Sequence, residues 1–179
     1  MRKVVHKLFW VWQFDKEEKW LNEMVAKGLC LVSVGLCRYE FEDCLPGEYK
    51  IRMELLENSP RSVESSQYIS FIEETGVEQV GSCMRWVYFR KKAAEGPFEL
   101  FSDNDSRINH LTRIIRFMLS MGVANLIVGF YNLFLCYYWQ SELNFLGIVN
   151  LVVCVFLAVG SFGLMKKRRR LRTEQLLFG

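Results

Sequence analysis

The chain has few of the residues that most enzymes use for catalysis. Among its 179 residues there are two histidines, His6 and His110, and neither lies in a Ser/His/Asp, Cys/His or HExxH pattern. No glycine-rich phosphate-binding loop occurs, since nothing like a P-loop follows Gly76 and Gly81. The carboxylates lie where solvated helix faces and helix caps place them. We therefore expect no catalytic residues, no metal site and no cofactor, and a protein that is not an enzyme.

The cysteines also lack the spacing of a metal or redox motif. Six are present without any CxxC, and Cys30, Cys37 and Cys44 are spaced by seven residues, which is not a zinc spacing. Cys136 and Cys154 lie in long apolar segments, where a thiol acts as a small apolar side chain. Because cytosolic thiols stay reduced, we interpret the cysteines as structural or incidental. Cys44, in a predicted turn, is expected to be the most exposed.

The chain is rich in apolar residues near its C-terminus, where two long runs cover 117–139 and 145–165. Neither run contains Asp, Glu, Lys, Arg or Pro, and each reaches the roughly 20 residues that a helix needs to cross a bilayer. Residues 140–144 leave room only for a tight turn. The sequence therefore predicts a hairpin of transmembrane helices at 114–139 and 145–165, in a multi-pass protein of the cell membrane.

Basic residues at the ends of the apolar runs predict the orientation. Arg107, Arg113 and Arg116 precede the first run, and a basic cluster follows the second: Lys166, Lys167, Arg168, Arg169, Arg170 and Arg172. The link at 140–144 has no Lys or Arg, so the positive-inside rule places both termini in the cytoplasm. No cleavable signal peptide is recognised. We interpret the basic cluster as a membrane anchor against anionic headgroups, with a specific acidic-lipid or partner site as the alternative.

Polar and small residues within the runs indicate how the two helices pack. Asn132 and Asn150 lie at similar distances from the link, so we expect them at similar depth, where they can form an interhelix polar pair. Small residues let the helices approach closely: Gly122, Ala124, Gly129, Ala158, Gly160 and Gly163. No charged residue in the runs marks an ion path.

Residues 1–95 are predicted to form a cytosolic α+β domain. The pattern gives strands over 7–14, 29–41, 49–55 and 83–90, a helix from Asp15 to Lys27 and a helix from Ser62 to Thr75. The order β-α-β-β-α-β predicts a ferredoxin-like fold, with the two middle strands as a hairpin. No internal repeat is recognised. Residues 96–113 are expected to be a juxtamembrane linker and helix, and 166–179 a basic cytosolic tail.

Strands that are apolar on both sides predict a partner for the open face of this sheet. The possible interaction surface comprises Phe9, Val11, Trp12, Trp20 and Trp86. A second copy, another protein or a downstream segment is favoured over a small molecule, and core packing is the alternative role of these residues. Residues 1–100 contain 14 basic and 16 acidic residues, so no nucleic acid is expected. The expected partners are membrane lipids and a protein or second copy.

Several separated motifs of the chain are similar to those of one bacterial family. They are FWxWxFxKEEKWLNEM at 9–24, AKG at 26–28, PGEY at 46–49, FIEETG at 71–76, RWVYFRK at 85–91 and GPFELFSD at 96–103. Over about residues 6–110 the chain resembles the domain-of-unknown-function family twenty-eight-twelve. The resemblance implies a short soluble domain followed by membrane spans, in proteins often encoded beside PadR-like transcriptional regulators. It implies no activity and no catalytic residue.

Together these patterns favour a membrane-anchored cytosolic interaction or sensory domain, non-catalytic and regulatory in a PadR-associated envelope-stress system. Two alternatives stay open. One is a small-molecule-binding protein, or a cofactor-free enzyme that resembles the dimeric α/β-barrel monooxygenases, and it would need a deep apolar pocket. The other is an accessory subunit of a membrane transport complex, and it would co-purify with other membrane proteins.

Overall fold

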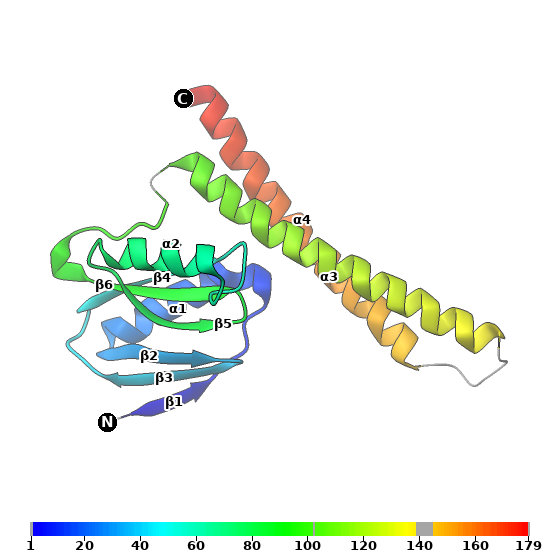
Figure 1. Cartoon of the computed structure of the whole chain (residues 1–179), viewed down its shortest axis with the longest axis horizontal. Helices are drawn as coiled ribbons and strands as arrows, with labels where there is room; N and C mark the ends of the chain where they lie inside the picture. Colours follow the sequence, from blue (N-terminus) through cyan, green and yellow to red (C-terminus); the bar gives the residue numbers. More distant parts are fainter. Residues whose placement is uncertain (1, 102, 139–144, 179) are drawn as a thin grey trace. The chain divides into compact units, whose positions relative to one another are not determined.

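The computed structural model describes residues 2–101, 103–138 and 145–178, which belong to two compact units, Met1–Ser102 and Asp103–Gly179 (Figure 1). The first unit is a mixed α+β domain, and the second is a pair of long apolar helices, as the sequence predicts. The predicted external link at 140–144 lies outside the described residues.

The domain contains two three-stranded antiparallel sheets. The first sheet has the order β1-β3-β2, with β1 at Lys3–His6, β2 at Leu29–Gly35 and β3 at Arg38–Asp43. The second sheet has the order β4-β6-β5, with β4 at Tyr49–Leu55, β5 at Glu78–Cys83 and β6 at Trp86–Lys92. A short 3-10 turn, η1 (Val11–Gln13), leads into helix α1 (Phe14–Ala26), and helix α2 (Val63–Glu73) follows β4.

The predicted ferredoxin-like order is not confirmed, because the chain turns back at two places that the sequence does not mark. The hairpin turns are Leu36-Cys37 between β2 and β3, and Met84-Arg85 between β5 and β6. Neither turn contains glycine or asparagine, yet Cys37 and Met84 both have φ at 55°, the left-handed conformation that tight hairpins require. As a result β4 pairs with β6, and the predicted hairpin between 29–41 and 49–55 does not form.

The domain consists of two βαββ repeats, β1-α1-β2-β3 and β4-α2-β5-β6. In each repeat the second and third strands form a hairpin, and the first strand pairs antiparallel with the third. The hairpins correspond with an offset of 48 residues: the bulge between Leu31 and Ser33 matches the bulge between Gln79 and Gly81. The expectation that the chain has no internal repeat is therefore wrong at the level of structure.

The two sheets meet along β2 and β5, and α1 lies between them (Figure 1). The strands approach so closely that a Cβ on Gly81 would lie 3.3 Å from the backbone nitrogen of Val34, which favours glycine there. Helix α1 buries Leu21 and Val25 completely, whereas α2 covers the opposite face of the second sheet. The apolar cluster beneath α2 comprises Leu56, Ile69, Val77, Val87, Phe89 and Phe98.

Helix boundaries in the domain largely follow the capping residues of the sequence. Ser62 is the N-cap of α2, and its Oγ accepts a hydrogen bond from the Ser65 N–H at 3.3 Å. Both helices are followed by a glycine with positive φ, Gly28 at 79° and Gly76 at 83°. Helix α1 begins at Phe14 rather than after Asp15, because η1 has already turned the backbone before that point.

Residues 7–14 do not form the predicted first strand. The alternating aromatic residues of this segment pack into separate clusters: Phe9 lies 5.5 Å from Trp20, and Phe14 lies 5.8 Å from Trp86, measured between ring centroids. The aromatic residues alternate in the sequence because successive side chains of this non-strand segment are buried on different sides of it. The strand β1 lies earlier in the chain and has only four residues.

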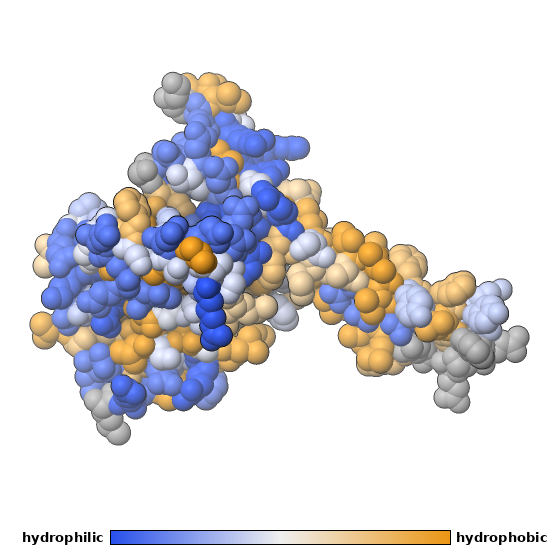
Figure 2. Space-filling view, viewed as in Figure 1, coloured by the Kyte–Doolittle hydropathy of each residue, from blue (hydrophilic) through white to orange (hydrophobic). Residues whose placement is uncertain are grey.

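The second unit consists of α3 (Asn104–Tyr138) and α4 (Phe145–Phe178), each long and apolar enough to cross a membrane. Only 11% and 17% of their most apolar segments are buried, so the apolar side chains point outward, and Figure 2 shows this hydrophobic surface. Of the predicted small residues, Gly122, Gly129 and Gly160 are buried, whereas Ala124, Ala158 and Gly163 are exposed. A Cβ on Gly129 would lie 2.9 Å from Leu151 of α4.

Candidate functional site

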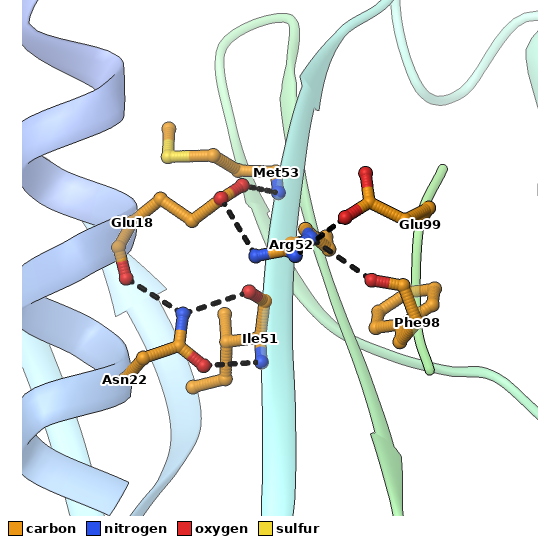
Figure 3. Close-up of polar contacts among 7 residues, drawn as sticks. All are labelled: Glu18, Asn22, Ile51, Arg52, Met53, Phe98 and Glu99. Atoms are coloured by element: carbon orange, nitrogen blue, oxygen red, sulfur yellow. Dashed lines mark hydrogen bonds and ion pairs between the residues drawn. The ribbon is translucent and has the colours of Figure 1, made fainter. Parts of the chain in front are cut away.

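Arg52 of β4 binds three groups from separate parts of the domain (Figure 3). Its Nη1 donates to Glu18 Oε1 on α1 at 3.0 Å, its Nε donates to the Phe98 carbonyl at 3.0 Å, and its Nη2 donates to Glu99 Oε1 at 3.2 Å. Residues 98 and 99 follow β6 and the 3-10 turn η2 (Ala93–Glu95). The GPFELFSD motif therefore begins with a segment that Arg52 attaches to α1 and β4.

Two side chains of α1 extend these contacts along the backbone of β4. The Asn22 amide accepts a hydrogen bond from the Ile51 N–H at 3.0 Å and donates one to the Ile51 carbonyl at 2.9 Å. Glu18 Oε2 accepts from the Met53 N–H at 3.2 Å. Residues 18 and 22 are one helical turn apart, so they face alternate residues of the strand. We call Glu18, Asn22, Arg52 and Glu99 the Arg52 cluster.

The electrostatics of the Arg52 cluster are dominated by partial burial. Burial raises the pKa of the Glu18 carboxyl above its ordinary value, while the charge of Arg52 and the Met53 N–H oppose this shift. The side chains of Glu18 and Arg52 are only 24% and 27% exposed, so their ion pair is shielded from water better than a surface pair. The cluster therefore acts mainly as a structural connection.

A shallow groove of about 470 Å³ opens beside the Arg52 cluster. It is lined by Lys50, Arg52, Ala93, Gly96, Pro97, Phe98 and Glu99. These residues supply two cations and one carboxylate, but no thiol, hydroxyl or imidazole. The groove can bind a charged group by ion pairing with Lys50, Arg52 or Glu99, and its lining offers no hydroxyl or thiol nucleophile and no imidazole base.

A second buried polar group joins α1 to both sheets. Glu17 is 7% exposed, and its Oε1 accepts hydrogen bonds from the Tyr39 hydroxyl of β3 at 2.7 Å and the Tyr88 hydroxyl of β6 at 2.6 Å. Burial raises the pKa of Glu17, and the two hydrogen bonds lower it in part. Burial and the neighbouring Glu17 also raise the pKa of both phenols, which therefore remain donors.

The Cys83 thiol near this carboxyl is not activated for nucleophilic attack. Burial, followed by the charges of Glu17 and Cys37, raises the pKa of the Cys83 thiol. A reactive cysteine requires the opposite shift, because the thiolate is the nucleophile. Glu17, Tyr39 and Tyr88 thus form a hydrogen-bonded link between the sheets without an adjacent activated nucleophile at Cys83.

The four aromatic residues of the predicted interaction surface are divided among three aromatic clusters. Trp20 packs edge-on against Tyr39 and Phe41, at 5.1 and 5.8 Å between ring centroids, and Phe9 joins it. Trp12 stacks on Trp10 at 5.6 Å, and Trp86 stacks on Phe14. Phe9, Val11, Trp12, Trp20 and Trp86 are all half-buried. An interaction role for them stays a prediction.

The predicted polar residues of the helix pair are brought near one another but not directly opposite. The Asn132 Cβ lies 3.3 Å from the position of a Cβ on Gly147, one helical turn before Asn150. Each asparagine amide donates to the carbonyl four residues earlier in its own helix, at 2.8 Å for Asn132 and 2.9 Å for Asn150. The interhelix polar pair stays a prediction.

The basic cluster Lys166, Lys167, Arg168, Arg169, Arg170 and Arg172 lies on the last part of α4, which continues as a helix to Phe178. Arg170 pairs with Glu174 at 2.9 Å, and Arg168 donates to the Thr112 hydroxyl of α3 at 3.5 Å. Most of the cluster is exposed, as an anchor to headgroups requires.

Comparison with known families gives one match. A family model described as "Protein of unknown function (DUF2812)" matches residues 13–123, which is more than half of the chain. The chain belongs to this family. No curated protein and no solved structure matches it. The DUF2812 match includes the Arg52 cluster and Glu17 with its two tyrosines, whereas β1 and α4 lie outside it.

Sequence reasoning missed the Arg52 cluster of this DUF2812 protein because it assigned the alternate residues of β4 to solvent. Ile51, Met53 and Leu55 are buried as the alternation predicts, but Glu54 is also buried and accepts a hydrogen bond from the Tyr68 hydroxyl at 2.8 Å. The signal was the density of charges on a strand whose other face is apolar. Three charged residues, Lys50, Arg52 and Glu54, alternate along this strand. Such a density indicates that a neighbouring element supplies partners for some of them.

Proposed function

We propose that this DUF2812 protein is a membrane-anchored, non-catalytic interaction protein, whose domain binds a protein partner through the end that carries the two hairpin turns. The observation that carries the proposal is the exposure of large apolar side chains at these turns. Leu36 is 79% exposed and Met84 is 70% exposed. These two side chains add nothing to the buried core, and their exposure favours a contact that excludes water.

The two turns lie at the same end of the domain. Strands β2 and β5 run side by side in the same direction, with Gly81 against Val34, and each strand reaches its turn within three residues of this contact (Figure 1). The Lys7 N–H donates to the Cys37 carbonyl at 3.1 Å, which places Leu8, 58% exposed, beside the first turn. We call Leu8, Leu36 and Met84 the tip surface.

The buried polar groups of the domain support a non-catalytic role. The donors of Arg52 are taken by Glu18, Glu99 and the Phe98 carbonyl. The oxygen Oε1 of Glu17 accepts from both tyrosines. These groups hold elements of the fold together, so their contacts account for their burial without a substrate.

Membrane anchoring belongs to the same proposal. The outward-facing apolar surface of α3 and α4 suits lipid, and the basic residues at their outer ends suit the cytoplasmic leaflet. Both termini and the domain would then be cytoplasmic. The regulatory setting that the family resemblance implies, beside PadR-like regulators in an envelope-stress response, would give the tip surface a partner on this side of the membrane.

The mass of the full-length protein in mild detergent, measured by light scattering and native mass spectrometry, tests the interaction. We expect a species larger than the monomer, a homodimer or a complex with a co-purified protein. The double variant Leu36→Asp with Met84→Asp should return it to the monomer. Phe71→Asp, at a residue of α2 that is 62% exposed, is the matched control and should leave the mass unchanged.

Two results would contradict the proposal. One is a wild-type protein that is monomeric and gives no cross-linked product in cells. The other is a monomer that carries a defined small-molecule adduct, which would favour a ligand-binding function instead. Reporter fusions at both termini test the orientation separately, and a reporter that is active only outside the cytoplasm should be inactive at either end.

A further inference from the structure

Two cysteines and a glutamate come together where the first βαββ repeat passes into the second. Cys30 lies in β2, Cys44 directly follows β3, and Glu48 directly precedes β4. Their sulfur and carboxylate ligand atoms all lie within 4.8 Å of one another. We propose that, when its thiols are reduced, this group is a binding site for a thiophilic divalent ion of the Zn²⁺ type.

The chemistry of the three side chains fits such an ion. Zn²⁺ is bound in proteins by cysteine thiolates and by carboxylates, and three protein ligands leave a fourth position for water or another donor. Among the residues that the structure describes, no second group of three His, Cys, Asp or Glu ligand atoms lies as close together. Cys30 is 1% exposed, so one ligand is already removed from bulk water.

Backbone hydrogen bonds position the loop that carries Cys44 and Glu48. The Cys44 N–H donates to the Gly28 carbonyl at 2.9 Å, and the Gly47 N–H donates to the Val25 carbonyl at 3.0 Å. These two bonds attach the crossover loop, residues 44–48, to the end of α1. Glu48 is positioned by the Leu45 N–H, which donates to Glu48 Oε2 at 3.0 Å. A metal ion therefore meets a loop that is already folded.

The structure contains Cys30 and Cys44 as a disulfide. Metal binding and the disulfide exclude each other, because both use the same sulfur electron pairs. In the reduced protein, two thiols release two protons and bind the ion as thiolates. Oxidation by a small-molecule disulfide transfers two electrons to that oxidant, which leaves as two thiols while the Cys30–Cys44 bond forms. The site is then closed to the metal.

The position of the site gives it a structural consequence. Residues 44–48 are the only covalent connection between the two βαββ repeats. Either the metal or the disulfide ties the start of this connection to β2 of the first repeat. Loss of both leaves the backbone hydrogen bonds to α1 as the attachment.

The test uses Co²⁺ as the probe, with full-length protein purified in mild detergent without a polyhistidine tag and reduced with a phosphine. Bound Co²⁺ should give a thiolate-to-cobalt charge-transfer absorption at one ion per chain, and added Zn²⁺ should remove it. Cys30→Ser and Cys44→Ser should each abolish the absorption. Glu48→Gln, which keeps an oxygen for the Leu45 N–H, should weaken binding at least about tenfold.

The controls separate this site from other cysteines and carboxylates. The absorption should stay unchanged in two control variants. One is the double variant Cys37→Ser with Cys83→Ser, and the other is Glu42→Gln in β3. Prior treatment with oxidised glutathione should prevent Co²⁺ binding, and a phosphine should restore it. Near-ultraviolet circular dichroism checks that each variant remains folded, and Cys44 is the less buried of the two cysteines.

Several results would overturn the proposal. They are a reduced wild-type protein without thiolate absorption, an absorption that depends on Cys37 or Cys83, and an affinity that Glu48→Gln does not change. Because the readout is metal binding to the purified chain, it does not depend on the tip surface. A monomeric protein that binds Co²⁺ through these residues would contradict the proposed function and support the metal site.

Discussion

Helices α1 and α2 occupy equivalent places in the two βαββ repeats, but they are held in different ways. Three polar side chains of α1 correspond, at the offset of 48 residues, to three serines of α2: Glu17, Glu18 and Asn22 match Ser65, Ser66 and Ser70. Helix α1 lies between two sheets and reaches both with these side chains. Helix α2 covers one sheet and has an apolar cluster beneath it.

The difference shows that the same βαββ arrangement can place its helix either between two sheets or on the outer face of one sheet. A helix between two sheets passes beside strand backbone and buried hydroxyls, which must be hydrogen-bonded when they leave water. A helix on an outer face needs an apolar side toward its sheet and small polar residues elsewhere. Helix α1 therefore depends on polar contacts to both sheets, whereas α2 depends mainly on its apolar cluster and makes a polar contact from Tyr68 to the buried Glu54.

The largest effects are expected where the repeats are most alike, in their cores. Phe41 and Phe89 are counterparts, and both are 0% exposed. Phe41→Ala and Phe89→Ala should each lower the free energy of unfolding by about 3–5 kcal/mol, because each leaves a large cavity. Urea unfolding of the full-length protein in detergent, followed by near-ultraviolet circular dichroism, measures this. A Phe89→Ala variant as stable as wild type would show that the second repeat lacks an equivalent core.

Arg52 and Arg38 should separate a polar connection inside the fold from one on its surface. Arg52→Met leaves partly buried Glu18 without its ion pair and should cost about 2–3 kcal/mol. Arg38→Met breaks an ion pair with Glu40 in which the Arg38 side chain is 54% exposed, and it should cost less than about 1 kcal/mol. The same urea unfolding measurement compares the two variants. Equal losses of unfolding free energy would refute a special role for the Arg52 cluster.

The glycines after the two helices give a third matched pair. Gly28→Ala and Gly76→Ala each force a side chain into the left-handed region, which costs about 1–2 kcal/mol. A Cβ on Gly28 would also lie 3.0 Å from the Cys44 backbone oxygen, whereas one on Gly76 meets only the flexible end of Glu95 at 3.2 Å. Gly28→Ala should therefore be the more destabilising of the two. The reverse order in thermal unfolding would mean that the crossover loop moves freely.

The smallest effect concerns pH and the buried Glu17. Because burial raises its pKa in the folded state, its contribution to stability is present below the unfolded pKa and is lost as the pH rises through the folded pKa. Glu17→Gln removes this loss. The stability of the variant relative to wild type should therefore improve between pH 4 and pH 7.

Glu23→Gln, at an exposed residue of the same helix, is the control for this pH dependence and should show no such change. The measurement is the urea midpoint at each pH. A Glu17→Gln variant whose relative stability falls as the pH rises would show that the two tyrosine hydrogen bonds outweigh burial.

Local signals in the sequence located much of the fold. Ser62 and Gly76 delimit α2, Gly28 ends α1, and the alternation after Tyr49 gives β4, because each depends on backbone conformation or burial over a few residues. The two apolar helices followed from length and composition alone. The membership in the DUF2812 family also followed from motifs and is confirmed.

The topology and the candidate sites depend on contacts that no local pattern encodes. Leu36-Cys37 and Met84-Arg85 turn the chain without glycine or asparagine, so the first hairpin was predicted as one strand over 29–41, and β5 was not predicted. The repeat cannot be recognised in the sequence, because equivalent positions of the two halves carry chemically different residues, such as Glu17 and Ser65. The pairing of Cys30 with Cys44 depends on β2 and β3 lying side by side, which the spacing of seven does not reveal.

The side chain of Asn22 has a consequence for assembly. Strand β4 is the outer strand of its sheet, and the outward N–H and carbonyl of Ile51 and the N–H of Met53 are occupied by α1. A strand from a second copy therefore finds no open backbone at the middle of β4 to extend the sheet. The Asn22 amide makes the hydrogen bonds that a neighbouring strand would make, and it thereby prevents edge-to-edge association at this strand. Copies of the domain can then associate only through their side-chain surfaces at this position.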